Sequence, residues 1–172
     1  MITKDKILEV FKDLNEELKR NGVSGEICVV GGAAMTLAFN ARLSTHDVDA
    51  VFSPKMDVQI SAIDVGKKHG LDVDWLNDAV KIFMPETDPK SKKVILKMSN
   101  LLVWSPDASY LLAMKSISAR PTDIRDIKFL IKKLNFKTEK EVFETIKHYY
   151  PNGKISERTM NLLLSIFEDE LK

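Results

Sequence analysis

The first third of the chain changes from helical to strand spacing of its hydrophobic residues. Thr3 is a suitable N-cap and Gly22 a suitable stop for an amphipathic helix, whose apolar face would be formed by Ile7, Leu8, Phe11, Leu14 and Leu18. The apolar run from Glu26 to Val30 then enters Gly31-Gly32, and good helix formers follow from Ala33 to Ala38. This order predicts helix, strand, tight glycine turn and helix.

Acidic and apolar residues alternate in the next segment. Thr45 to Phe52 carries Asp47 and Asp49 at alternate positions, which on a strand would place both carboxylates on one face. Ser53-Pro54 predicts the N-cap and first residue of a helix that ends at Gly70. Residues 93–104 predict two further strands that turn at Ser99-Asn100.

The rest of the chain has helical patterns. Ser105-Pro106 predicts the start of a helix that ends before Pro121, and three more helices are expected from Thr122-Asp123, from the capping box at Thr138 and from Ser156. The predicted fold class is therefore α+β, a small mixed sheet flanked by helices and followed by a helical bundle. We expect an α/β core over residues 1–104 and a C-terminal helical region over 105–172 packed on it.

Composition narrows the class of protein only slightly. A chain of 172 residues with a net charge of +1 suits one soluble core with an appendage. That charge does not indicate a nucleic-acid binder, although Lys90, Lys92 and Lys93 could form a local basic face. Cys28 is the single cysteine, which excludes a disulfide framework and suits a small buried residue. With no signal peptide or membrane span in the sequence, we expect a cytoplasmic protein.

Asp47 and Asp49 are the strongest candidates for chemistry. Two carboxylates aimed at one point repel each other unless a cation lies between them. Phosphoryl and nucleotidyl transfer use such cations to neutralise phosphate oxygens. The simpler alternative is a surface strand with two solvated acids. The three histidines, His46, His69 and His148, lack the spacing of zinc ligands.

Gly31-Gly32 is the second candidate. Glycines between a strand and a helix let the backbone approach a phosphate. A tight turn without a ligand is the alternative, because turns recruit glycine for conformational reasons alone. The order of strand, Gly-Gly, helix and acidic strand favours a phosphate site beside a metal site.

These residues also resemble a known superfamily. Val30-Gly31-Gly32 followed by Thr45-His46-Asp47-Val48-Asp49-Ala50 is similar to the signature of the polymerase-beta-like nucleotidyltransferases. Downstream, Leu111 to Lys115 and Arg120 to Asp126 resemble the motif of the AbiEii-like branch, the nucleotidyltransferase toxins of type IV toxin and antitoxin pairs. With Trp75-Leu76-Asn77 between them, the resemblance covers roughly residues 29–134.

The resemblance implies an activity and a set of site residues. It implies transfer of a nucleotide from a nucleoside triphosphate, with Mg²⁺ or Mn²⁺, to an RNA such as tRNA or to a protein, and an antitoxin as a possible partner. Asp47 and Asp49 would hold the metal, and Lys115 would meet the triphosphate. Asp126 would help to arrange it, and Arg120 is a further candidate nucleotide contact. The alternatives are a solvated lysine and a charge-rich helix start.

A third carboxylate is missing from the expected place. Many members of the superfamily supply one from a following strand, yet the strands expected within residues 93–104 contain no acid. Asp74 is the preferred candidate for a third metal ligand and Asp72 the next, with a helix-capping aspartate as the alternative. The missing acid leaves open a binding module that kept the fold and lost catalysis.

The motif Asp47-Val48-Asp49-Ala50-Val51 also fits the start of haloacid-dehalogenase-like phosphatases. That family places its first aspartate after a buried, continuous apolar strand. Residues 43–46 are largely polar, so this alternative is the less favoured one.

Overall fold

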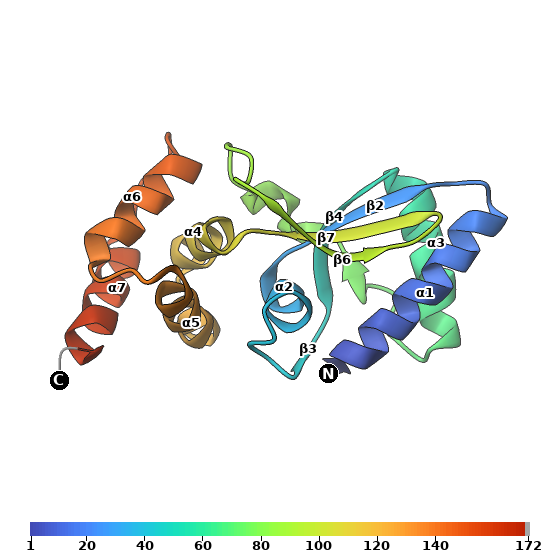
Figure 1. The fold of residues 1–172 in the computed structure, drawn as a ribbon, viewed down its shortest axis with the longest axis horizontal. Coiled ribbons are helices and arrows are strands. Elements are labelled where there is room, and N and C mark those ends of the chain that lie inside the picture. The colour runs from blue at the N-terminus through green and yellow to red at the C-terminus, as the bar shows by residue number, and fades with distance from the viewer. Residues whose placement is uncertain (171–172) are drawn as a thin grey trace. The chain divides into compact units, whose positions relative to one another are not determined.

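The computed structural model describes residues 1–170 of the chain. It has the predicted α+β fold, with a five-stranded mixed sheet and seven α-helices in the described part (Figure 1). The chain forms two compact units. The first comprises Met1–Ile82 and Lys92–Pro106, and the second comprises Phe83–Ser91 and the residues from Asp107 onward.

The first unit is built on the five-stranded sheet, in the order β5-β4-β2-β7-β6. Its strands are β2 (Gly25–Val29), β4 (Val48–Ser53), β5 (Leu76–Asn77), β6 (Lys92–Lys97) and β7 (Leu101–Pro106). β2 runs antiparallel to β4 and parallel to β7, while β5 is parallel to β4 and β6 antiparallel to β7. A second, two-stranded sheet pairs β1 (Ile2–Thr3) with β3 (Ser44–Thr45).

Helices α1 (Lys4–Arg20) and α3 (Lys55–Lys68) lie side by side on one face of this sheet (Figure 1). Both helices reach Gly25 of β2, because an added Cβ there would lie 3.0 Å from Leu18 and 3.1 Å from Val58. Thr3 caps α1 by accepting a hydrogen bond from the Lys6 N–H, as predicted. The core under the two helices is apolar and includes Ile7, Phe11, Leu14, Leu18, Ile27, Ala62 and Val65.

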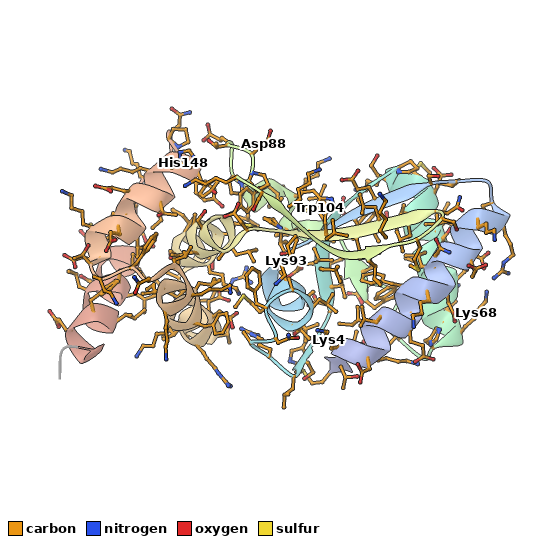
Figure 2. The ribbon with its side chains drawn as sticks, viewed as in Figure 1. Lys4, Lys68, Asp88, Lys93, Trp104 and His148 are labelled. Atoms are coloured by element: carbon orange, nitrogen blue, oxygen red, sulfur yellow. The ribbon has the colours of Figure 1, made fainter. Side chains whose placement is uncertain are left out.

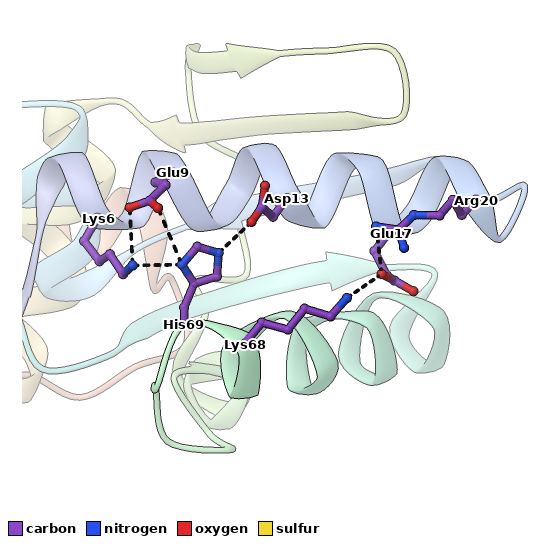
Figure 3. A network of polar contacts seen from close by, with 7 residues as sticks. All are labelled: Lys6, Glu9, Asp13, Glu17, Arg20, Lys68 and His69. Carbon is purple, nitrogen blue, oxygen red and sulfur yellow. Dashed lines mark hydrogen bonds and ion pairs between the residues drawn. The ribbon is translucent and has the colours of Figure 1, made fainter.

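A polar network joins the solvent side of α1 to the end of α3 (Figure 3). Lys6 Nζ lies 2.8 Å from His69 Nδ1, and His69 Nε2 lies 2.7 Å from Asp13 Oδ2. Because an ammonium has only donors, Nδ1 accepts and Nε2 donates to the carboxylate. Glu17 pairs with Lys68 at 3.1 Å and with Arg20 at 3.2 Å. His69 thus links α1 to the end of α3.

Two lysines of β6, Lys92 and Lys93, contact other residues of the first unit. Lys92 Nζ lies 4.1 Å from the centre of the Trp104 ring and 3.3 Å from Glu26. Trp104, labelled in Figure 2, donates its indole N–H to Glu26 Oε1 at 2.6 Å. Lys93, also labelled there, bonds to the Ala38 carbonyl and lies over the Phe39 ring. These charges are therefore partly engaged within the protein.

The second unit is helical. It contains α4 (Ala108–Ser118), the 3₁₀ turn η2 (Pro121–Asp123), α5 (Ile124–Leu134), α6 (Glu139–Tyr149) and α7 (Glu157–Glu170). α4 packs against α5, α6 and α7, and the shared core includes Leu111, Leu112, Ile127, Leu130, Val142, Ile146, Tyr149, Leu163 and Ile166. The predicted capping box at Thr138 and the predicted cap at Ser156 are both present.

Residues 83–91 join this helical unit through hydrogen bonds at its surface. The Tyr150 hydroxyl donates to the Phe83 carbonyl at 2.8 Å, and Thr87 Oγ1 donates to the His148 carbonyl at 2.9 Å. The Ser91 N–H donates to Asp107 Oδ2 at 3.1 Å. The sequence pattern shows only a polar loop between two prolines here, with no sign of this pairing.

Two predicted helix starts are displaced along the chain. Pro54 has extended backbone (ψ 136°) and precedes α3, although Ser53 was expected to be the cap. β7 continues through Pro106, so Asp107, and not Ser105, caps α4 with bonds from the Ser109 and Tyr110 N–H groups. A carboxylate satisfies two free N–H groups at once, which explains why the helix begins after Asp107.

Candidate active site

The glycine turn and the acidic strand meet closely. Gly31 begins the short helix α2 (Gly31–Leu37) with a φ of +58°, and a Cβ on it would lie 2.8 Å from Asp49 Oδ2. The Val30 N–H donates to the Asp49 carbonyl at 2.9 Å. Only glycine combines this positive φ with that close approach. The structure therefore brings together the two motifs that the sequence singled out.

Gly32 extends the same region toward the loop that follows α2. A Cβ on Gly32 would lie 2.7 Å from Thr45 Oγ1 and 3.6 Å from Arg42 Nη1. Thr45 is buried, with 5% of its surface exposed, and its strand β3 is held by pairing with Ile2. A hydroxyl and a guanidinium thus lie beside the glycine backbone, and both are groups that bind phosphate oxygens.

Asp47 lies just before β4, not within it as the alternation predicted. The chain changes partner here, since Thr45 pairs with β1 while the Val48 N–H bonds to the Trp75 carbonyl at 2.6 Å next to β5. Asp47 occupies the link between these pairings. Its Oδ2 accepts a hydrogen bond from Asn77 Nδ2 at 3.2 Å.

A cavity of about 400 Å³ opens beside Asp47. Three carboxylates and one imidazole contribute to its wall, and the lining residues are Met1, Ile2, His46, Asp47, Gly70, Leu71, Asp72, Asp74 and Trp75. This volume is that of a small-molecule or side-chain pocket. No lysine or arginine is among these described lining residues, so the cavity favours a neutral or cationic ligand group.

Asp47 and Asp49 offer carboxylate oxygens, which are the ligands that Mg²⁺ and Mn²⁺ prefer. Within residues 1–170, no three histidine, cysteine, aspartate or glutamate side chains are grouped closely enough to hold a metal ion. Asp74 is exposed and lines the cavity with Asp47, so its part as a third ligand stays a prediction. It caps no helix, because β5 follows it.

The predicted residues of the downstream motif lie in the second unit. Lys115 on α4 is buried, with 7% of its side chain exposed, and its Nζ lies 2.7 Å from both Asp123 Oδ1 and Asp126 Oδ2. The Asp126 side chain is fully buried. Two carboxylates around one ammonium hold the lysine in a fixed position. The alternative of a solvated lysine is therefore wrong.

Arg120 differs from Lys115 in its surroundings. It is exposed and precedes η2, where its carbonyl accepts from the Asp123 N–H at 2.9 Å. Ser118 Oγ donates to Asp123 Oδ2 at 3.0 Å, which fixes the other oxygen of that carboxylate. The segment from Lys115 to Asp126 is thus a folded polar cluster with two exposed arginines, Arg120 and Arg125, at the start of α5.

The other reactive side chains are structural. Burial raises the pKa of the Cys28 thiol to about 12, so the thiol stays protonated and unreactive at neutral pH. Burial likewise raises the pKa of the Tyr149 hydroxyl, which contacts Ser109 Oγ at 2.8 Å. Tyr149 is fully buried in the helical core.

Residues 5–171 match the model of a family described as "Nucleotidyltransferase of unknown function (DUF6036)". The chain belongs to this family. No curated protein and no solved structure matches it.

Membership of a nucleotidyltransferase family implies a nucleoside triphosphate substrate. The match spans both units, so it includes the segment around Lys115 as well as the glycine turn. In the described part of this DUF6036 chain, no helix has both the length and the apolar character needed to cross a membrane.

Three residues of the region are missed by sequence reasoning. The resemblance includes Asn77 and Thr45 without giving either a role, and no pattern singles out Arg42. Asn77 does carry a local signal, because asparagine side chains often accept a hydrogen bond from the backbone N–H two residues later and so form a turn. The Ala79 N–H donates in this way to Asn77 Oδ1 at 3.2 Å. Arg42 and Thr45 approach Gly32 across the fold, which no local pattern reveals.

Proposed function

We propose that this member of the DUF6036 family is a Mg²⁺- or Mn²⁺-dependent nucleotidyltransferase that moves a nucleotide from a nucleoside triphosphate to an acceptor hydroxyl. The acceptor oxygen bonds to the α-phosphorus, and pyrophosphate leaves. One observation carries the proposal. The glycine turn is fitted against the carboxylate of Asp49, because a Cβ added to Gly31 would lie only 2.8 Å from Oδ2. A phosphate-binding turn and a cation-binding acid are thereby adjacent.

The acids would hold the metal. Asp47 and Asp49 supply oxygen ligands. Asp47 Oδ2 also accepts a hydrogen bond from the Asn77 amide at 3.2 Å. A bound Mg²⁺ would neutralise phosphate oxygens and orient the reacting groups. The backbone at Gly31 and Gly32, with no side chain in the way, would contact the phosphates.

From the resemblance, we take Lys115 and the exposed Arg120 as further nucleotide contacts, and Asp126 as the residue that positions Lys115. The 2.7 Å pair between Lys115 and the fully buried Asp126 supports the positioning role.

The acceptor is inferred from the cavity beside Asp47. Its wall carries three carboxylates, from Asp47, Asp72 and Asp74. Asp72 and any of this charge that the metal leaves uncompensated would repel a phosphate backbone, so of the two expected acceptors we favour a protein hydroxyl over an RNA. Action as the toxin of a pair with an antitoxin is the further part of the proposal, which rests on the resemblance to the AbiEii-like branch.

The experiment uses each of the four α-labelled nucleoside triphosphates with Mg²⁺ and either total protein or total RNA. Wild type should transfer label, and Asp47→Asn and Asp49→Asn should lower the rate roughly 100-fold or more, since several kcal/mol of charge stabilisation depend on the metal. Asp64→Asn is the matched control, because that acid is exposed on α3 and pairs with Lys67 at 3.8 Å. Equal transfer by all three variants would refute the proposal.

The two alternatives differ in outcome. A binding module would bind nucleotide and Mg²⁺ in calorimetry without transferring label to either acceptor. A phosphatase of the Asp-x-Asp type would hydrolyse a generic phosphate monoester, with loss in Asp47→Asn. The structure argues against the phosphatase, since Asp47 precedes β4 and follows the short β3, not a buried parallel strand.

A further inference from the structure

Asn77 connects the edge of the sheet to Asp47. β5 pairs in parallel with the first residues of β4, with Leu76 opposite Val48 and Asn77 opposite Asp49. From this position Asn77 Nδ2 donates to Asp47 Oδ2 at 3.2 Å. An amide is neutral, so it can orient a carboxylate without cancelling the charge that a cation needs.

The direction of the Asn77 amide is set by its second bond. The Ala79 N–H lies 3.2 Å from Asn77 Oδ1, and a backbone N–H can only donate. The oxygen of the amide must therefore face Ala79, which turns the NH₂ group toward Asp47. The donor to Asp47 is thus fixed by the turn, and not by the carboxylate alone.

The strand that carries Asn77 is itself anchored in the core. Trp75 is buried, and its indole N–H donates to the Ala62 carbonyl of α3 at 2.8 Å. Gly66 of α3 makes room for the ring, since a Cβ there would lie 2.6 Å from it. The Trp75 carbonyl in turn accepts from the Val48 N–H at 2.6 Å. The backbone next to Asn77 and the backbone next to Asp47 are therefore both fixed, the first by the buried Trp75 and the second by the bond from Val48 to Trp75.

We propose that Asn77 is a positioning residue for Asp47, which fixes the carboxylate in the orientation that binds the catalytic metal. This inference rests on the proposed function, since it needs a metal at Asp47. Partners of metal ligands typically change metal affinity about 10- to 100-fold when removed. Loss of the Asn77 donor has this effect while leaving the sheet intact.

The test compares Asn77→Ser with wild type. Serine can still accept from the Ala79 N–H, as in other hydroxyl-based turns, but it is too short to reach Asp47. Asp78→Asn is the control in the same turn, because Asp78 contacts Lys55 at its surface. Mn²⁺ is titrated into each protein, alone and with α,β-methylene nucleoside triphosphates, and protein-bound Mn²⁺ is measured by its paramagnetic resonance. Thermal melting without metal monitors the fold.

We expect Asn77→Ser to weaken Mn²⁺ binding about 10- to 100-fold, with a melting temperature close to that of Asp78→Asn and a transfer rate that recovers at saturating metal. Unchanged Mn²⁺ affinity in Asn77→Ser, together with loss in Asp47→Asn, overturns the role of Asn77 and leaves the proposed function standing. Absence of Mn²⁺ binding by wild type in both conditions overturns the metal-dependent function itself, and the role of Asn77 with it.

Discussion

Lys115 and Asp126 form a buried ion pair, with 2.7 Å between Nζ and Oδ2. The lysine side chain is 7% exposed and the aspartate side chain is not exposed at all. Asp123, at 2.7 Å and 13% exposed, is the second carboxylate on the same ammonium. Lys115 therefore has a structural role in the helical unit besides any contact with phosphate, and the two roles need separate measurements.

Lys115→Ala should lower the free energy of unfolding of the helical unit by about 3 to 5 kcal/mol, because it takes the ammonium away from two carboxylates that the fold removes from solvent. Asp123→Asn should cost less, since Lys115 keeps Asp126 and Asp123 is partly exposed. Chemical denaturation followed by circular dichroism measures both. Equal stability of Lys115→Ala and wild type would contradict a structural role, and any activity loss in Lys115→Ala counts only at temperatures where the variant is folded.

Gly31→Ala should lower both stability and nucleotide use. The positive φ costs about 1 to 3 kcal/mol for a residue with a side chain, and the added Cβ would displace the Asp49 carboxylate, 2.8 Å away. Gly22→Ala is the matched control, because Gly22 has a φ of +68° and nothing within 4 Å of an added Cβ. We expect both variants to be destabilised by the positive φ, with an additional loss in Gly31→Ala from the displaced carboxylate, and we expect loss of label transfer in Gly31→Ala only. Equal transfer by both would show that the contact with Asp49 does not matter.

Asp107 should make the helical unit less stable in acid. Burial alone would raise the pKa of its carboxyl, but hydrogen bonds from the Ser109 hydroxyl and from the N–H groups of Ser91, Tyr110 and Ser109 outweigh it and lower the pKa below 3.8. A folded-state pKa below the unfolded one stabilises the fold above about pH 4, and this contribution is lost as the pH falls through the folded-state value.

Asp107→Asn removes that titration and keeps an oxygen that can cap the helix. Above about pH 5 we expect wild type to be more stable than the variant by about 1 kcal/mol, and the difference should shrink as the pH falls below 3.8, the ordinary pKa of the group. Thermal melting across the acidic range up to neutral pH measures it. A difference that stays constant over this range would contradict the assignment.

Expression of wild type in a bacterial host should slow growth if the protein is a toxin. Asp47→Asn and Asp49→Asn should relieve the effect, because both remove a carboxylate from the proposed metal site. Growth curves after induction, with protein levels matched by immunoblot, measure it. Asp64→Asn should remain as harmful as wild type. Identical growth of all strains would speak against the toxin role without touching the transfer reaction.

Local patterns are enough to predict most of the elements. The helical spacing from Ile7 to Leu18 predicts α1, and the capping box at Thr138 predicts α6. Both patterns involve only residues that are close together in the sequence. The proximity of the glycine turn and Asp49 was predicted from order alone. Their contact is confirmed by the geometry, since Gly31 has no room for a Cβ beside Asp49.

The remaining features depend on contacts between distant segments. Asp47 was expected on a strand, but pairing of Thr45 with Ile2, which lies far away in sequence, leaves Asp47 before β4. Asn77 reaches Asp47 across a parallel strand pair. Asp107 replaces Ser105 as the helix cap because β7 extends further than its apolar residues indicate. No single-segment pattern contains this information.

The pairing of β1 with β3 has a practical consequence. Ile2 lies opposite Thr45, two residues before Asp47, and both Met1 and Ile2 line the cavity at the acids. A substitution at Met1 or Ile2 would therefore alter the wall of this cavity without touching an acid, so variants of these two residues cannot serve as neutral controls in an assay of the site.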